Sequence, residues 1–239
     1  MKLERETNIF FKSKPVECSY IENKNEQRLF LNLNQTSSTN FKIVNELTKV
    51  GFRRNLNFMY LPFCNQCSKC ISTRVNVRTF ITSKSQKRNL KKNKSISFLK
   101  QLENKNDERY GLFKKYLSVR HENGQMNSMT ETDFNNFFYN SPTDSLVFDL
   151  VYDRQILGSI LLDNLYDGMS AVYSFYDPRY IKNGLGIFLI LKTIQEVKKL
   201  NKEFLYLGYW VEGSKKMDYK KNFNSIEFFR NGKWFKSLN

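Results

Sequence analysis

The sequence lacks a long hydrophobic run. No apolar stretch approaches the ~20 residues that a membrane-spanning helix needs. The first residues, Met1–Asn8, are too polar for the apolar core of a signal peptide. We therefore expect a cytoplasmic protein that does not act at a membrane.

Acidic side chains are missing from a long stretch in the first half of the chain. Between Leu47 and Leu102 there are thirteen lysines and arginines but no aspartate or glutamate. The chain as a whole has a net charge of +16, and most of the excess comes from this block. Such a concentration of positive charge favours a partner rich in phosphate.

The basic block reads either as a solvated, disordered arm or as part of a folded surface. Over residues 74–81, apolar Val75, Val77 and Ile81 are assigned to one side and Arg74, Asn76 and Arg78 to the other, which is the period of a strand with one basic face. Aromatic residues are interleaved with the basic ones, as is typical of RNA-binding surfaces. The residues expected to contact RNA are Arg53, Arg54, Arg74, Arg78, Lys84, Arg88 and Lys91.

The four cysteines are too closely spaced for a simple disulfide framework. Cys64, Cys67 and Cys70 form a Cys-x-x-Cys-x-x-Cys run, and Cys18 precedes it. Together they would supply four soft ligands, which suit zinc and an iron–sulfur cluster equally well. The alternative is that they are reduced thiols that pack or shape the surface.

No long proline- or glycine-rich linker divides the chain. A polar stretch at 104–109 is the best boundary, and it predicts an N-terminal domain of residues 1–103 and a C-terminal domain of residues 104–239. In the second domain the hydrophobic period changes from helical to strand-like and back. It predicts helices at 109–121, 130–139 and 185–200, and strands at 146–152, 156–162, 169–176 and 203–211.

These elements predict an α+β protein. The N-terminal domain should be small and mixed and contain the cysteine cluster. The C-terminal domain, with three strands, a helix and a further strand, has the element order of an N-acetyltransferase-like (GNAT-type) fold. Gly184 and Gly186 precede its long helix, where acetyl-CoA enzymes bind pyrophosphate. However, Ile181 occupies the position where those enzymes carry arginine or glutamine, and a tight turn into a helix explains the glycines equally well.

Several runs, in order along nearly the whole chain, resemble the arginyl/leucyl-tRNA–protein transferases. The C-terminal runs are the more specific: Tyr-Leu-Gly-Tyr-Trp at 206–210, then Lys-Met-Asp-Tyr-Lys at 216–220. Ser225 departs from the family, which usually has proline there. Earlier matching runs lie at 51–54, 60–70, 74–77, 116–121, 170–173 and 176–178.

The resemblance implies an enzyme that moves an amino acid from a charged tRNA to the N-terminus of another protein. The chain length favours the bacterial aspartate/glutamate leucyltransferase branch, which transfers leucine from Leu-tRNA to N-terminal Asp or Glu. Such transfer marks proteins for degradation through a protease adaptor. Arginine as the donor stays open, because Asp163, Asp177 and Glu212 lie near the expected site and could face an arginine side chain.

The reaction is the aminolysis of an ester, so it requires no cofactor and no serine or cysteine nucleophile. Positioning of the two substrates, a base for the α-amine and donors for the oxyanion would supply the acceleration. The residues expected to be catalytic are Asp163, Tyr173, Tyr209 and Lys216. Those expected to bind the acceptor or the donor are Arg120, His121, Ser170, Tyr206, Trp210, Tyr219 and Lys220.

Two other functions fit parts of the sequence. A CoA-dependent N-acetyltransferase fits the predicted C-terminal fold, but not the basic N-terminal half. A non-catalytic RNA-binding module stabilised by a metal fits the basic block and the cysteines, but it leaves the C-terminal runs unexplained.

Overall fold

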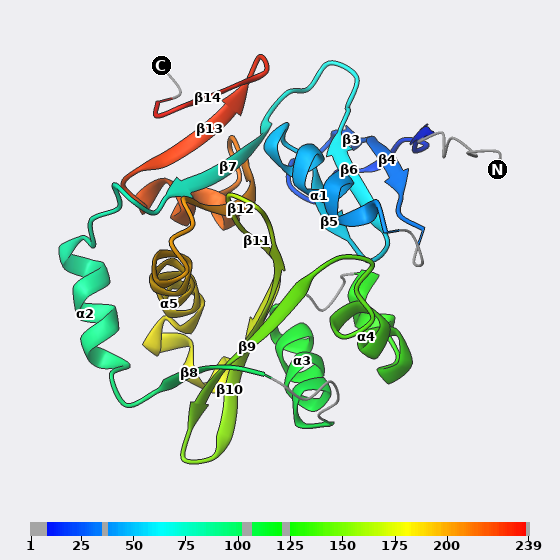
Figure 1. Cartoon of the computed structure of the whole chain (residues 1–239). Coiled ribbons are helices and arrows are strands. Elements are labelled where there is room, and N and C mark those ends of the chain that lie inside the picture. The colour runs from blue at the N-terminus through cyan, green and yellow to red at the C-terminus, as the bar shows by residue number, and fades with distance from the viewer. Residues whose placement is uncertain (1–8, 35–37, 102–106, 121–124, 238–239) are drawn as a thin grey trace.

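The computed structural model describes residues 9–34, 38–101, 107–120 and 125–237. Two sheets of unequal size form its framework (Figure 1). The smaller has four strands in the order β1-β4-β6-β5, and the larger has eight in the order β14-β13-β7-β12-β11-β10-β9-β8. The predicted α+β class is confirmed in this coarse sense.

The small sheet and one helix form an N-terminal unit, residues 9–62. Helix α1 joins the strands and packs with them and with the large sheet around buried Val44, Phe52 and Met59. Between β1 and β4 in the sequence, strands β2 and β3 form a two-stranded antiparallel ribbon. The elements are β1 (Phe10–Lys12), β2 (Val16–Glu17), β3 (Asn25–Glu26), β4 (Arg28–Asn32), α1 (Asn40–Lys49), β5 (Arg53–Asn55) and β6 (Phe58–Pro62).

The large sheet contains strands from both halves of the chain. Strand β7 (Cys70–Asn76) lies between β12 and β13, and β8 (Ser97–Lys100) forms one edge. The boundary predicted at residue 103 therefore cuts through this sheet, since strands on either side of it are hydrogen-bonded. The other strands are β9 (Ser145–Tyr152), β10 (Gln155–Asn164), β11 (Gly168–Tyr176), β12 (Phe204–Val211), β13 (Ile226–Arg230) and β14 (Lys233–Phe235).

Helices cover both faces of the large sheet, so its central strands are apolar along their whole length. Helix α5 (Leu185–Lys199) packs on one face through residues such as Phe188 and Ile194. Helices α3 (Asp107–Arg120) and α4 (Glu131–Phe138) pack on the other face through Phe113 and Phe134. Figure 1 shows α2 (Lys84–Lys92) on the same side as α5 and away from α3 and α4.

The predicted C-terminal elements are confirmed to within a few residues. Strands β9, β10, β11 and β12 and helices α3, α4 and α5 lie where the hydrophobic period placed them. Helix α4 begins at the predicted residue because the Thr130 side chain accepts from the backbone N–H of Asp133, while Asp133 bonds back to Thr130. No helix of the described residues has the length and hydrophobicity needed to cross a bilayer.

The prediction for residues 74–81 is correct only in part. Val75 and Val77 are buried beneath the large sheet, as strand alternation requires. Ile81, assigned to the same apolar face, lies beyond the end of β7 and is 70% exposed. The chain has turned there toward α2. Ser83 is the N-cap residue of this helix and forms a capping box with Gln86 in the first turn.

Candidate active site where β11 and β12 separate

The two parallel strands of the large sheet, β11 and β12, are paired over only a short length. Their register runs from Gly168 opposite Phe204 to Ser170 opposite Tyr206, and no pairing follows. Beyond this point β12 contains a bulge at Gly208, whose φ of +72° is readily adopted only by glycine. The bulge shifts the alternation of the strand and turns the Tyr209 side chain toward the N-terminal unit.

Arg53, from strand β5 of the N-terminal unit, reaches into the place where the strands separate. Its Nη2 donates to the carbonyl oxygens of Ala171 at 2.7 Å and Val172 at 3.1 Å. Gly208 leaves the room for this side chain, since a Cβ there would lie 1.9 Å from Nη1 of Arg53. The guanidinium thus occupies the space between β11 and β12.

Lys220 lies beside this point and is almost fully buried, with 3% of its surface exposed. It belongs to the 3₁₀ segment η3 (Lys215–Asn222), and its Nζ donates to the carbonyl oxygen of Tyr209. Burial, and then the charge of Arg53, lower the pKa of Lys220 well below its usual value. The environment therefore disfavours the charged form of this amine relative to an exposed lysine.

Tyrosines surround these two basic groups. The Tyr209 hydroxyl lies 3.0 Å from the Gly51 carbonyl oxygen and 2.9 Å from that of Tyr60, and burial raises its pKa well above the usual value. Burial also raises the pKa of Tyr219, which Arg53 opposes. These side chains offer neutral hydroxyl groups and apolar ring faces at neutral pH.

A second group of aromatic residues lies on the α3 side of the same region. Burial, followed by the proximity of Tyr116, raises the pKa of Tyr173. Burial also raises the pKa of Tyr116, to which exposed Arg120 donates a hydrogen bond. Tyr116 in turn is close enough to Tyr219 to influence its pKa. Tyr173, Tyr209, Tyr219, Lys220 and Arg120 are thus linked through neighbouring groups, whereas His121 lies outside the described residues.

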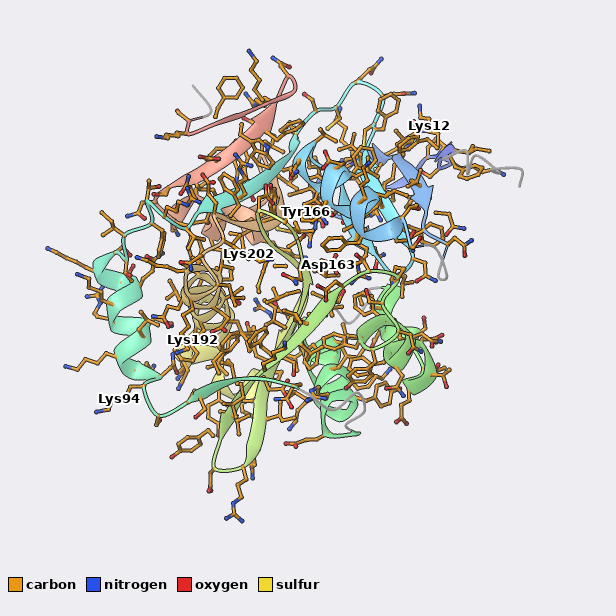
Figure 2. All side chains as sticks on the ribbon, viewed as in Figure 1. Lys12, Lys94, Asp163, Tyr166, Lys192 and Lys202 are labelled. Atoms are coloured by element: carbon orange, nitrogen blue, oxygen red, sulfur yellow. The ribbon has the colours of Figure 1, made fainter. Side chains whose placement is uncertain are left out.

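Asp163, expected to be the base, occupies a different environment. Its two oxygens accept from Arg54, at 2.8 Å from Nε and 2.7 Å from Nη2, and Oδ1 also accepts from Ser145 at 2.7 Å. Both partners of the ion pair have side chains only 1% exposed. Figure 2 shows Asp163 in the interior of the molecule. A carboxylate with this many fixed partners holds the N-terminal unit to the large sheet, and its side chain is almost fully shielded from solvent.

Of the other predicted site residues, Tyr206, Trp210 and Ser170 are buried and, among the residues that the structure describes, make no hydrogen bond with Arg53 or Lys220, and Lys216 is exposed. The Tyr206 hydroxyl donates to Asp167 at 3.0 Å, and the Trp210 ring packs among Ile226 and Phe228. Ser170 is buried at the last paired position of β11. Lys216 is exposed on η3.

The residues predicted to bind RNA divide into two groups. Arg54 is buried in its ion pair, Arg53 points between β11 and β12, and Arg74 pairs with Glu227 at 2.8 Å between aromatic rings. Arg54 is therefore too buried to contact RNA in this conformation, whereas Arg53 and Arg74 are partly exposed but already have partners within the protein. Sequence could not have shown this, since a basic residue at a strand position can face either way.

The other group is exposed and lies on or near α2. Arg78 is mostly exposed, and Lys84, Arg88 and Lys91 project from α2. Gln86 fixes the helix to Asn222, and Asn89 fixes it to the loop before α5, so its basic side is left outward. Lys94 extends outward just beyond α2 (Figure 2). This helix presents a folded, positively charged surface.

The four cysteines line one small pocket of about 30 Å³, together with Tyr20, Tyr60 and Tyr209. Burial, and then the proximity of Cys64, Cys18 and Cys67, raise the pKa of Cys70 to about 12. The donor chemistry suits a soft metal ion. Within the described ranges, however, no three Cys, His, Asp or Glu side chains are placed to hold one.

Arg53 and Gly208 are the site residues whose roles the sequence did not reveal. Both lie in runs that carry the family resemblance, at 51–54 and 206–210. Arg53 was grouped with the RNA-binding residues because of its charge. Gly208 gave no signal of its own, since a single glycine in an apolar strand fits a bulge or a close approach equally.

Two family models match the chain. The model described as "Arginine-tRNA-protein transferase, N terminus" matches residues 16–88, and its C-terminal counterpart matches residues 108–230. A solved structure, that of L-PGS from Bacillus licheniformis, is 14% identical, has a TM-score of 0.44 and covers 59% of this chain and 45% of that one. A likeness at that level does not assign a fold.

Relatives match over most of the chain. The "Aspartate/glutamate leucyltransferase" of Dinoroseobacter shibae is 35% identical and that of Ruegeria pomeroyi 36%, each over 94% of this chain and 82% of the relative. The protein of the same name from Acinetobacter baumannii is 34% identical over 94% of this chain and 83% of its own. The chain therefore belongs to the arginine-tRNA-protein transferase family.

Proposed function

We propose that this enzyme transfers leucine from Leu-tRNA to the α-amine of proteins that begin with Asp or Glu. The observation that carries the proposal is the identity of about 35% over 94% of the chain to aspartate/glutamate leucyltransferases. In the reaction the neutral α-amine attacks the aminoacyl carbonyl carbon and forms an amide. The ester bond to the terminal ribose breaks, and the ribose oxygen leaves as a hydroxyl after gaining a proton.

The tRNA is proposed to lie along α2 and the preceding turn. Lys84, Arg88, Lys91 and Arg78 are exposed there without a close carboxylate, apart from a 3.7 Å contact between Arg78 and Glu203. Contacts of this type bind phosphate without reading base sequence, which suits an enzyme that recognises the amino acid and the general shape of a tRNA end.

Transfer itself is proposed to occur where β11 and β12 separate. The Tyr219 hydroxyl is the donor proposed for the developing oxyanion, whereas the Tyr209 hydroxyl is already bonded to the carbonyl oxygens of Gly51 and Tyr60 and shapes the site. Tyr173 and Arg120, on the α3 side, are proposed to hold the substrates, and Lys216 lies at the open edge. Holding the amine against an already activated ester could supply ~7–11 kcal/mol of the acceleration.

The fold around this point is proposed to be of the N-acetyltransferase type. Its support is the order β9, β10, β11, α5, β12, with antiparallel pairing before the helix and parallel pairing after it. A CoA-dependent reaction gains little support from the loop at Gly184, because the backbone N–H of Gly184, which would have to donate to a pyrophosphate, already donates to the carbonyl oxygen of Ile181 at 3.1 Å.

Binding of zinc or an iron–sulfur cluster by Cys18, Cys64, Cys67 and Cys70 is a separate proposal. It is supported by the convergence of four thiols on one pocket, and it requires the side chains to move closer together. No step of the transfer uses such a group. Elemental analysis and the visible spectrum of anaerobically purified protein would identify it, with the Cys67→Ser/Cys70→Ser variant as the control.

The deciding experiment compares donors and acceptors directly. Purified enzyme is incubated with radiolabelled Leu-tRNA or Arg-tRNA and with model proteins that differ only in an N-terminal Asp, Glu, Arg or Lys. We expect label from Leu-tRNA on the Asp and Glu acceptors. Label from Arg-tRNA alone would replace leucine by arginine in the proposal, and no transfer from either donor would overturn it. Degradation of the products through a protease adaptor is the expected consequence in a cell.

A further inference from the structure

Two basic side chains of the interior region, half-buried Arg53 and buried Lys220, have no carboxylate opposite them. Arg54 pairs with Asp163, and Arg109 pairs with Asp149, both at 2.7 Å. By contrast, Arg53 and Lys220 make no ion pair within the part of the chain that the structure describes, and they donate instead to backbone carbonyl oxygens. We refer to Arg53 and Lys220 as the basic pair.

An arrangement of this kind is costly for the fold. A buried charge without a counter-charge loses its hydration and gains little in return. The two members of the basic pair also oppose each other, since Arg53 contributes to the lowered pKa of Lys220. A buried lysine with a lowered pKa, such as Lys220, is typical of binding and catalytic sites, where a ligand supplies the missing counter-charge.

The position of the basic pair limits the size of the missing anion. It lies where β11 and β12 separate, among the rings of Tyr209 and Tyr219. Arg53 Nη2 is committed to Ala171 and Val172, so Nη1 and Nε remain as donors together with Lys220 Nζ. Those donors suit the two oxygens of a single carboxylate, whereas the exposed charges suited to a polyphosphate chain lie on α2.

We propose that the basic pair binds the side-chain carboxylate of the acceptor's N-terminal Asp or Glu and so selects acidic N-termini. This inference rests on the proposed leucine transfer. When the carboxylate enters, Lys220 is held as the ammonium, and the anion offsets one of the two positive charges of the pair. An acceptor that begins with Asn or Gln has the same shape but leaves the buried pair without its counter-charge, so it is rejected.

The test compares two acceptor peptides that differ in one group. Initial rates of leucine transfer give kcat/KM for an Asp-peptide and for the matching Asn-peptide with the same Leu-tRNA. In the wild type we expect a large preference for Asp. Lys220→Met should lower kcat/KM for the Asp-peptide by about 100-fold, as expected when one partner of a buried charged contact is removed, and leave the Asn value nearly unchanged.

Two further variants make the result specific. Lys215→Met removes an exposed lysine from the same segment and should keep the Asp preference. Lys220→Gln retains a donor for the Tyr209 carbonyl oxygen, so this variant is used if Lys220→Met does not fold. It should lose the preference for the Asp-peptide to the same extent. Circular dichroism and thermal unfolding check each preparation.

The outcomes separate this inference from the function on which it rests. A wild type that transfers no leucine to the Asp-peptide removes the proposed function and the inference with it. A wild type that transfers leucine, with Lys220 variants that keep the Asp-over-Asn ratio or lower both rates equally, overturns the inference alone. Loss of the ratio in the Lys220 variants and its retention in Lys215→Met supports it.

Discussion

The ion pair of Arg54 and Asp163 allows a structural role to be separated from a catalytic one. Asp163→Ala leaves the buried guanidinium of Arg54 without its two charged contacts, and Ser145 loses the acceptor at 2.7 Å. Breaking a fully buried pair by removing one partner costs about 3–5 kcal/mol. We expect a loss of about 4 kcal/mol in the free energy of unfolding.

Replacing both partners should restore much of this loss. In Arg54→Met/Asp163→Leu no buried charge is left, and apolar side chains of similar size fill the space. The remaining penalty is small, because Ser145 still bonds to Ser141 at 2.7 Å and only the Leu56 carbonyl loses its donor at 2.9 Å. One such loss costs about 1 kcal/mol, so the double variant should be about 2–3 kcal/mol more stable than Asp163→Ala.

The assay combines urea unfolding with leucine transfer at saturating substrates. If Asp163 only joins the two parts of the fold, activity per folded molecule in the double variant should stay within about 100-fold of the wild type, which is the loss that a misplacement of about 1 Å can cause. The reasoning would be refuted by an Asp163→Ala protein as stable as the wild type. It would equally be refuted by a stable double variant without activity, which would restore Asp163 as the base.

Three other measurements address the site and its surroundings. Gly208→Ala should lower the free energy of unfolding in urea by at least about 2 kcal/mol and reduce leucine transfer. The reason is that φ of residue 208 is +72° and the new Cβ would lie 1.9 Å from Arg53 Nη1. Unchanged stability would mean that Arg53 is not fixed at this place. The pKa of Lys220 lies below 10.5 in the folded protein, so folding releases a proton from this amine. The free energy of unfolding of the wild type, relative to that of Lys220→Met, should therefore rise as the pH approaches 10.5, which urea unfolding at pH 7, 8 and 9 would show. A difference independent of pH would contradict the burial of an unpaired amine. Changing Lys84, Arg88 and Lys91 together to Gln should reduce the slope of log KM for Leu-tRNA against log salt concentration by about 2–3 units. The control Lys198→Gln, at the C-terminal end of α5, should leave this slope unchanged. Equal slopes for the triple variant and the wild type would mean that the tRNA binds elsewhere.

The sequence predicted the C-terminal elements well because their signals are local. A strand covered on both faces, such as β10, reads as a continuous apolar run, and α5 repeats its apolar residues at helical spacing. Helix α2 was missed, although Ser83 and Gln86 have the spacing of a capping box. The reason is that only Leu90 interrupts its polar residues, so its hydrophobic period is nearly absent.

The candidate site was only partly predictable, since it depends on contacts between distant segments. Tyr209, Tyr219 and Lys220 were found through the resemblance. The pairing of Arg54 with Asp163 spans 109 residues, and the contact of Arg53 with Ala171 spans 118. Charge alone assigned both arginines to an outer surface. Only the fold shows that Arg54 holds the N-terminal unit to the large sheet and that Arg53 lies in the gap between β11 and β12.

The position of β7 also has a consequence for synthesis on the ribosome. This strand needs β12 on one side and β13 on the other, and its Thr73 bonds to Gly208, 135 residues later. At about 5–20 residues per second, roughly ten seconds pass before that partner is made. During this interval the apolar positions of β7 have no sheet to join, and the adjacent cysteines and basic residues are presented by an incomplete chain. Nascent-chain folding should therefore be completed only at the end of translation, with a chaperone covering β7 until then.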